Sequence, residues 1–386
     1  CTFSNPPYQK EYSQLAKRLE TDEDFGRILW IPSKTPLGFS SPTHLSLEAL
    51  RLIEKRPFAS SVVGSYELTN FIRQPYMGEL FDVSGIEYIV YPFPDTRREE
   101  LKPDNIKYYN WFLGNISNLD WTSPVTTGSA VPLIRSKKHQ DRFFLANGPF
   151  FIIGSDEIYS GLAKTNGFSL AKNALVFLEE KGNIKEDTIA LPTSKIILFG
   201  KDREDAAIDL TTDKKLIFPA ATLDFSPNAT GWWKRETADL ISWRNFLHEK
   251  YQLDNLDFDY GGGWAVGEGN RQLTISNRQF AKGNILLARV MLNPRGGKIS
   301  FYQDNELVGS INTKVANLGK VQIDANVATT KTGELIEYGR ASFLWVEVGN
   351  LKSDGALIIK TEGDINVVNS LLPISENGLN EAKANV

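Results

Sequence analysis

Hydrophobic positions in the first part of the chain recur at helical spacing. Between Tyr8 and Glu20, the residues Tyr12, Leu15 and Leu19 lie three or four positions apart, which predicts a helix with one apolar face. Similar patterns predict further helices over Leu45–Lys55, Asn105–Ile116, Asp156–Lys164, Arg203–Leu210 and Lys234–Lys250.

Short apolar runs separate these helices. Gly26–Pro32 and Gly85–Pro92 each read as a buried strand that ends at a proline. Further strand-like segments are Arg142–Ala146, Pro149–Ile153, Ala174–Glu179 and Lys195–Phe199. Because strands alternate with helices, we expect a mixed α/β or α+β domain with some parallel pairing.

The pattern changes to alternation of apolar and polar residues after Gly261. Eight strands are expected there: Arg271–Ser276, Ile285–Leu292, Lys298–Gln303, Glu306–Asn312, Lys320–Ala325, Ser342–Val348, Ala356–Thr361 and Ile365–Leu372. Turn sequences such as Asp304-Asn305 and Ser353-Asp354-Gly355 separate them. This order predicts an antiparallel β-sandwich of jelly-roll type.

These elements suggest a division of the chain. We expect a mixed α/β domain over 1–210, a helical connector over 211–260 and the β-sandwich over 261–375. The polar residues from Glu376 onward, 376–386, are expected to form a flexible tail.

Composition narrows the functional classes. The net charge is −4 and no basic stripe occurs, so nucleic acid is not expected as a partner. Cys1 is the only cysteine, which excludes a disulfide within the chain and leaves open a lipid anchor at this residue. No apolar run reaches the roughly 20 residues that cross a bilayer.

Sequence motifs for catalysis are missing. His44, His139 and His248 lie far apart, and none has a second histidine or cysteine at metal-ligand spacing, which argues against a transition-metal site. The chain also lacks a nucleophile elbow, a phosphate-binding loop and a dinucleotide-binding glycine motif. We therefore expect no catalytic residue in this chain.

The segment from Asp254 to Glu268 gathers acids and glycines. Asn255, Asp257 and Asp259 alternate and offer oxygen ligands that suit calcium, although the match to a calcium loop is partial. Asp257, Asp259 and Glu268 also allow a pair of carboxylates for glycoside hydrolysis. A third interpretation is structural, with the acids capping nearby backbone groups.

Aromatic residues cluster around the same junction. Trp232, Trp233, Tyr260 and Trp264 offer flat rings for stacking on a sugar, and Arg235 and Glu268 offer hydrogen bonds to its hydroxyls. The alternative is that the tryptophans, together with Trp243, fill a seam between the connecting helix and the sandwich.

Two sets of segments resemble known proteins. Gly26–Pro32, Ser84–Val90, Gly154–Tyr159 and Asn173–Phe177 resemble the extracytoplasmic region that follows the membrane helices in polytopic GT-C-type glycosyltransferase-like proteins. Ser342–Gly349, Asp354–Ile359 and Val367–Leu372 are similar to the closing strands of carbohydrate-binding jelly-roll modules. The membrane helices that hold the catalytic acid in such enzymes do not occur in this sequence, so no catalytic residue carries over.

The resemblance implies an extracytoplasmic, membrane-tethered protein of the cell surface or periplasm. Its expected role is to bind or position a glycan or cell-envelope polysaccharide for a membrane-embedded glycosyltransferase-like parent or partner. Two alternatives remain open: a surface lipoprotein or assembly subunit anchored at Cys1, and a glycoside hydrolase.

Overall fold

A computed structural model describes residues 9–34, 37–61, 70–92, 103–177, 196–199, 208, 218–219, 232–235, 240–257, 263–276, 280–316, 318–324 and 335–384. The chain forms two compact units. Unit 1 contains residues 1–149, 159–174 and 326–332, and unit 2 contains residues 150–158, 175–325 and 333–386. In the described residues, no helix has the length and apolar character needed to span a membrane.

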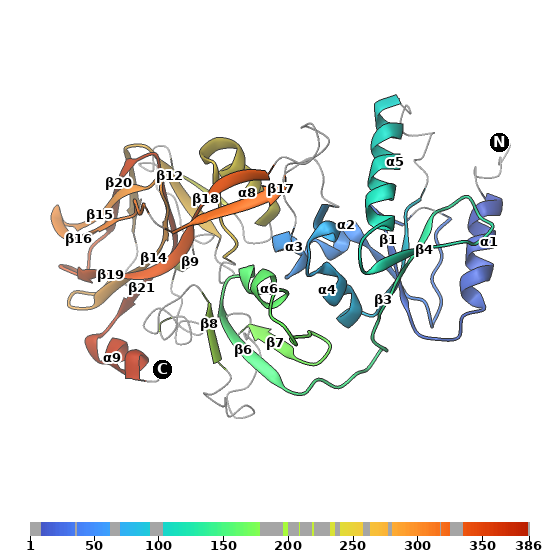
Figure 1. Cartoon of the computed structure of the whole chain (residues 1–386). Helices are drawn as coiled ribbons and strands as arrows, with labels where there is room; N and C mark the ends of the chain where they lie inside the picture. The colour runs from blue at the N-terminus through green and yellow to red at the C-terminus, as the bar shows by residue number, and fades with distance from the viewer. Residues whose placement is uncertain are drawn as a thin grey trace, which may run out of the picture. The chain divides into compact units, whose positions relative to one another are not determined.

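Unit 1 is built around a five-stranded mixed sheet with the order β2-β1-β3-β5-β4 (Figure 1). Its strands are β1 (Arg27–Trp30), β2 (Ser46–Glu48), β3 (Ile86–Val90), β4 (Thr122–Val125) and β5 (Leu133–Ser136). Its helices are α1 (Gln9–Glu20), α2 (Ala49–Leu52), α3 (Phe58–Ser61), η1 (Asn70–Arg73), α4 (Met77–Val83) and α5 (Pro103–Ser117). β1 runs parallel to β2 and β3, whereas β5 runs antiparallel to β3 and β4. The expected parallel pairing is thus present.

Helices cover both faces of this sheet. On one face, Leu15 and Leu19 of α1 join Trp30 and Tyr88 in a buried core. α4 lies against β3 and β5, and its Phe81 is fully buried. Every residue of β3 is buried, including Glu87, so this strand is covered on both sides.

Two predictions for unit 1 are corrected. Residues predicted as a helix from Leu45 begin as the short strand β2, because they pair with β1 through Ser46, and α2 follows only over Ala49–Leu52. Arg142–Ala146 does not form a strand; Phe143 and Leu145 are largely exposed, so these apolar residues have no core to join.

Unit 2 contains most of the remaining elements. They are β6 (Pro149–Gly154), β7 (Ala174–Phe177), β8 (Ile196–Phe199), β9 (Phe218–Pro219), β10 (Trp232–Arg235), α8 (Leu240–Tyr251), β11 (Leu253–Asp254), β12 (Trp264–Glu268), β13 (Arg271–Ile275), β14 (Ile285–Leu292), β15 (Gly297–Gln303), β16 (Glu306–Asn312), β17 (Lys320–Asp324), β18 (Leu335–Arg340), β19 (Ser342–Asn350), β20 (Leu357–Gly363), β21 (Ile365–Ile374) and α9 (Glu376–Ala384). α6 (Glu157–Leu162) includes residues of both units.

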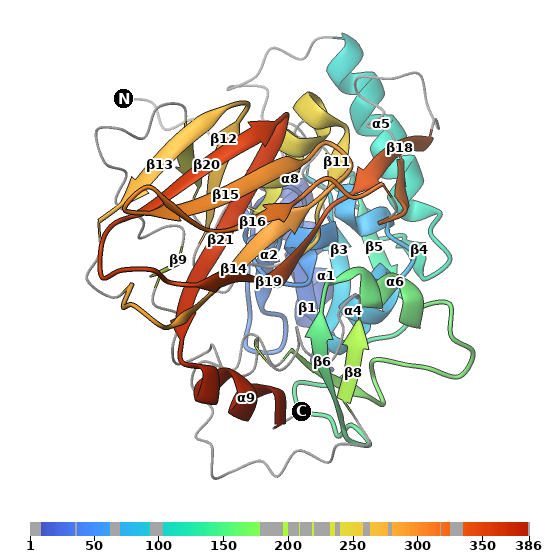
Figure 2. The ribbon, with the colours of Figure 1, turned by 90° about the vertical axis from the view of Figure 1, so that its left-hand side faces the viewer.

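Two antiparallel sheets form a β-sandwich in unit 2. One has the order β10-β12-β21-β14-β19, with β9 paired to β21, and the other has the order β13-β20-β15-β16 (Figure 2). Their inner faces share one core, in which Leu273, Phe301 and Ile359 of the four-stranded sheet meet Leu286 and Val368 of the larger sheet. Two three-stranded sheets, β11-β18-β17 and β7-β6-β8, complete the unit.

All eight predicted strands of the second half are present, within two residues at their ends, and seven of them lie in the two sheets of the sandwich. The strand predicted from Lys320 is corrected: it forms β17, which pairs with β18 in the separate sheet β11-β18-β17. The polar tail is corrected, because Glu376–Ala384 forms α9 and buries Leu379 and Ala382. The helix predicted from Lys234 is corrected at its start: Lys234 and Arg235 pair with β12, and α8 begins at Leu240. The domain boundaries predicted at 210 and 260 stay a prediction.

Candidate functional site

Two of the three tryptophans that were predicted to stack on a sugar, Trp232 and Trp264, are buried in unit 2. Trp264 is 1% exposed, and its ring stacks on the buried Trp243 of α8 with 4.8 Å between ring centroids. Trp232 is 7% exposed and belongs to the sandwich core, where Gly267 leaves room for it: a Cβ at Gly267 would lie 2.9 Å from the indole. These two rings present no face to a ligand, and the alternative of a seam between helix and sandwich describes them.

The polar residues near this seam are engaged with the protein itself. The Glu268 carboxylate accepts hydrogen bonds from the Lys250 ammonium and the Tyr251 hydroxyl. Burial and this contact with the carboxylate raise the pKa of Tyr251 above its ordinary value. The side chains of Trp233 and Arg235, and the whole of Tyr260, lie outside the described residues, so their role in binding stays a prediction.

The proposed calcium ligands have structural partners as well. Asn255 donates a hydrogen bond to the carboxylate of Asp257 over 3.1 Å and a second one to the carbonyl of Ala341 over 2.9 Å. Asp257 accepts a bond from the amide of Phe343 over 2.7 Å. These contacts match the interpretation in which the acids cap backbone groups, and Asp259 lies outside the described residues. Asp257 is hydrogen-bonded to a backbone amide, and Glu268 to the side chains of Lys250 and Tyr251. The structure therefore does not favour these two carboxylates as a hydrolytic pair.

A buried ionic network lies next to this segment. Asp254 accepts hydrogen bonds from Arg244 Nε over 2.9 Å and lies 2.7 Å from His248 Nε2, and His248 stacks on Tyr338. Burial alone would raise the pKa of Asp254, but Arg244 and His248 outweigh it and hold this pKa well below its usual range. The network fixes α8 to β11 and β18 and is closed to solvent.

The outer face of the four-stranded sheet is different, because several of its side chains are partly or largely exposed among the described residues. Residues directly opposite one another in antiparallel strands share a face. The register therefore places four partly or largely exposed side chains in one row across the sheet: Thr274 of β13, Ile358 of β20, Tyr302 of β15 and Leu307 of β16. Leu307 is 50% exposed.

A polar row lies beside this apolar one. It consists of Gln272, Lys360, Ser300 and Ser310, again one residue from each strand, and of these Ser300 is buried whereas the other three are exposed. The ammonium of Lys360 lies 4.9 Å from the centre of the Tyr302 ring. We call these eight residues the Tyr302 face. It combines an aromatic ring, two aliphatic side chains and several hydrogen-bonding groups on β13, β20, β15 and β16, which are all labelled in Figure 2.

Sequence reasoning missed this face. The strands β13, β15, β16 and β20 were predicted, but the predicted binding residues lay in the tryptophan-rich segment 232–268 instead. The alternation in Lys298–Gln303 marks Tyr302 as an outward residue, because Phe301 and Gln303 are buried on either side of it.

No protein-family model matches the chain, and no curated protein matches it. Parts of the chain are similar to solved carbohydrate-binding modules. One is CsCBM6-3 from Clostridium stercorarium in complex with cellobiose, at 12% identity and a TM-score of 0.24, with 41% of this chain and 92% of that chain covered. Another is CBM6cm-2 from Cellvibrio mixtus lichenase 5A in complex with cellotriose, at 12% identity and a TM-score of 0.20, with 41% and 95% covered.

The C-terminal CBM6 of LamC from Zobellia galactanivorans is a third similar structure, at 12% identity and a TM-score of 0.20, with 40% of this chain and 94% of that chain covered. Values this low do not place the chain in that family. The assignment as a β-sandwich rests on the strand pairing of unit 2 itself.

Proposed function

We propose that unit 2 binds a carbohydrate on the Tyr302 face and has no catalytic role there. The observation that carries the proposal is the partly exposed Tyr302 ring between Ile358 and Leu307. A sugar ring has an apolar face of C–H groups and a rim of hydroxyls. An aromatic ring with aliphatic neighbours suits the first, and an adjacent polar row suits the second.

Lys360 has a specific part in this arrangement. Its ammonium lies over the Tyr302 ring and is exposed, so a sugar can displace it from the ring without breaking a buried contact. Once displaced, the ammonium is within reach of the sugar's hydroxyls as a hydrogen-bond donor. Gln272 and Ser310, both exposed, provide further donors and acceptors on either side.

Binding is tested with the purified chain on a glycan array that includes cellotriose and oligosaccharides of bacterial cell envelopes, followed by calorimetric titration of each positive sugar. We expect at least one sugar to bind, and Lys360→Ala to weaken it about three- to tenfold. Lys282→Ala is the matched control, because Lys282 is exposed in the turn before β14 and is not one of the eight residues of this face, and the affinity of this variant is expected to stay within twofold of wild type.

An array without any binding contradicts the proposal. Equal affinity in wild type and Lys360→Ala places the sugar elsewhere. Sedimentation of the same samples reports whether the face instead joins two copies of the chain, which also contradicts it.

We further propose that the chain belongs to the extracytoplasmic region of a membrane glycosyltransferase-like protein. Its support is the resemblance of Gly26–Pro32 and Ser84–Val90, which form the neighbouring parallel strands β1 and β3 of unit 1. The genomic sequence upstream of Cys1 tests this: polytopic apolar helices are expected. Mass spectrometry of the native protein tests the alternative of a lipoprotein, which requires a diacylglyceryl group on Cys1.

A further inference from the structure

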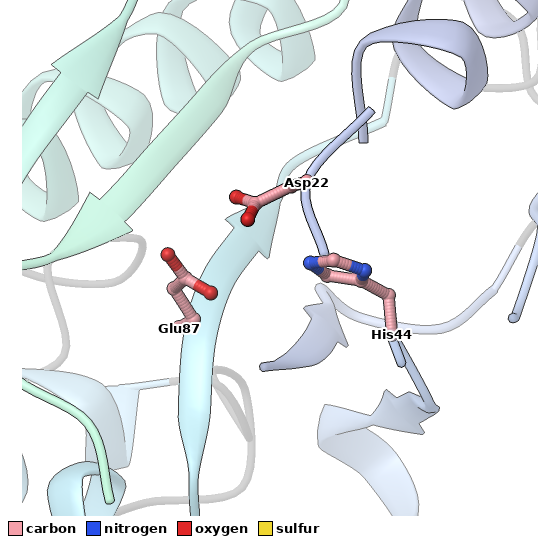
Figure 3. Close-up of side chains that lie close together, drawn as sticks. All are labelled: Asp22, His44 and Glu87. Carbon is pink, nitrogen blue, oxygen red and sulfur yellow. The ribbon is translucent and has the colours of Figure 1, made fainter. Parts of the chain in front are cut away.

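Three side chains with metal-ligating atoms meet at the amino ends of the parallel strands of unit 1. Asp22 precedes β1, His44 precedes β2, and Glu87 is the second residue of β3. One ligand atom from each lies within 4.8 Å of the other two. Figure 3 shows the three side chains pointing toward one another. Parallel strands bring their amino ends to one edge of the sheet. Asp22, His44 and Glu87 therefore converge there, although they are distant in sequence.

His44 has a buried nitrogen without a partner. The residue is 1% exposed, and its Nε2 has no hydrogen bond within the part of the chain that the structure describes. The other ring nitrogen, Nδ1, lies 3.1 Å from the hydroxyl of Thr43. With the proton on Nδ1, directed at Thr43, Nε2 carries a lone pair that faces the two carboxylates. Histidine ligands of metals are oriented by such a hydrogen bond on the second nitrogen.

The two carboxylates are held in place by neighbouring groups. The Tyr88 hydroxyl donates a 2.7 Å hydrogen bond to Asp22. Glu87 is fully buried, and Gly26 makes room for it, because a Cβ at Gly26 would lie 2.2 Å from Glu87 Oε2.

A cation already balances Glu87. Arg135 Nη2 lies 2.7 Å from Glu87 Oε1, and His139 Nε2 lies 3.6 Å from Oε2. The Arg135 side chain is 50% exposed, and it lines an open depression of about 640 Å³ together with Lys137 and Gln140. Arg135 can therefore turn into solvent without losing a buried position, which leaves the Glu87 carboxylate available to another cation.

We propose that Asp22, His44 and Glu87 bind a divalent first-row transition-metal ion, with Arg135 as the cation that balances Glu87 when the metal is absent. One imidazole and two carboxylates suit Zn²⁺, Mn²⁺ or Fe²⁺ rather than Ca²⁺. Three ligand atoms bound at about 2.1 Å to one ion lie roughly 3.0–3.6 Å from one another, so two atoms that start 4.8 Å apart move together by more than about 1 Å on binding.

The site is tested on the full chain after dialysis against a chelator, by calorimetric titration with Zn²⁺ and by the visible spectrum with Co²⁺. We expect one ion per chain and a d–d absorption band of bound Co²⁺. Asp22→Asn keeps the size of the side chain and is expected to weaken Zn²⁺ binding at least tenfold, as is His44→Gln. Glu20→Gln, on an exposed position of α1, is the control and is expected to bind as wild type does.

The Arg135→Gln variant distinguishes a specific metal site from a group of carboxylates that attracts cations without specificity. Removing the competing cation is expected to tighten Zn²⁺ binding about three- to tenfold, a change that damage to the fold does not produce. The proposal is overturned if wild type binds no ion, if all variants bind alike, or if Arg135→Gln weakens binding. Glycan binding by unit 2 is measured separately and does not enter these outcomes.

Discussion

Trp243 of α8 and Trp264 of β12 stack with their ring planes 8° apart and their centroids separated by 4.8 Å. Both residues are almost fully buried, so the stack joins the helix to the larger sheet of the sandwich. An aromatic pair in this offset geometry contributes beyond its buried area. Trp232 and Trp264, which were predicted from the sequence to bind a sugar, are therefore part of the core of unit 2.

Replacing Trp264 by alanine is expected to destabilise the chain. The change removes a fully buried indole and leaves a cavity beside Trp243, which costs about 3–5 kcal/mol. Chemical unfolding followed by tryptophan fluorescence and circular dichroism measures the effect. Leu307→Ala, on the 50% exposed side chain, is the control and is expected to change the free energy of unfolding by about 0.5 kcal/mol or less. Similar stabilities of the two variants would contradict the buried stack.

Acid is expected to weaken unit 2 through Asp254. The pKa of Asp254 in the folded state lies below its unfolded value of 3.8, so its contribution to stability is complete above that value. The contribution is lost progressively as the pH falls below about 5, because the unfolded state takes up the proton first. Unfolding curves recorded in urea across this range measure the slope.

Asp254→Asn is expected to flatten that slope and to cost about 3–5 kcal/mol at neutral pH, because it leaves Arg244 buried without its charge partner. Asp364→Asn is the matched control, since Asp364 pairs with Arg295 at the surface, where such pairs contribute about 0–1 kcal/mol. An unchanged acid slope in Asp254→Asn would show that other groups govern the pH dependence.

The fold could be predicted where the local pattern decides it. Short strand-like segments bounded by turn sequences such as Ser353-Asp354-Gly355 predicted the strands of the sandwich, and the prolines after β1 and β3 marked the ends of buried strands. It could not be predicted where tertiary contacts decide. The polar segment from Glu376 becomes α9 because Leu379 finds a place in a core with Ile285 and Trp345, which are distant in sequence.

The candidate sites could be predicted only in part. The sequence does not distinguish a tryptophan in a core from one on a surface, so the burial of Trp232 and Trp264 could not be predicted. The convergence of Asp22, His44 and Glu87 depends on the parallel order β2-β1-β3, which spacing along the chain does not reveal. The outward position of Tyr302 was present in the alternation of its strand, but the pairing that aligns Tyr302 with Ile358 and Leu307 was not.

Two glycines of unit 1 are expected to respond in opposite directions to alanine. Gly26→Ala places a Cβ 2.2 Å from Glu87 Oε2, and the shift that relieves this clash is expected to cost about 1–3 kcal/mol. Gly114 lies on the exposed side of α5 with no atom within 4 Å of an added Cβ, so Gly114→Ala is expected to stabilise by roughly 0.5–1 kcal/mol. Thermal unfolding of both variants checks this, and a neutral Gly26→Ala would contradict the close packing of Glu87.

The most direct test of carbohydrate binding at the Tyr302 face compares Tyr302→Ala and Tyr302→Phe in calorimetric titrations with a sugar that the wild type binds. Tyr302→Ala removes the ring and is expected to lower the affinity at least tenfold, whereas Tyr302→Phe keeps the stacking surface and is expected to stay within about threefold of wild type. Circular dichroism confirms that both variants fold. Wild-type affinity in a folded Tyr302→Ala would contradict the proposed site.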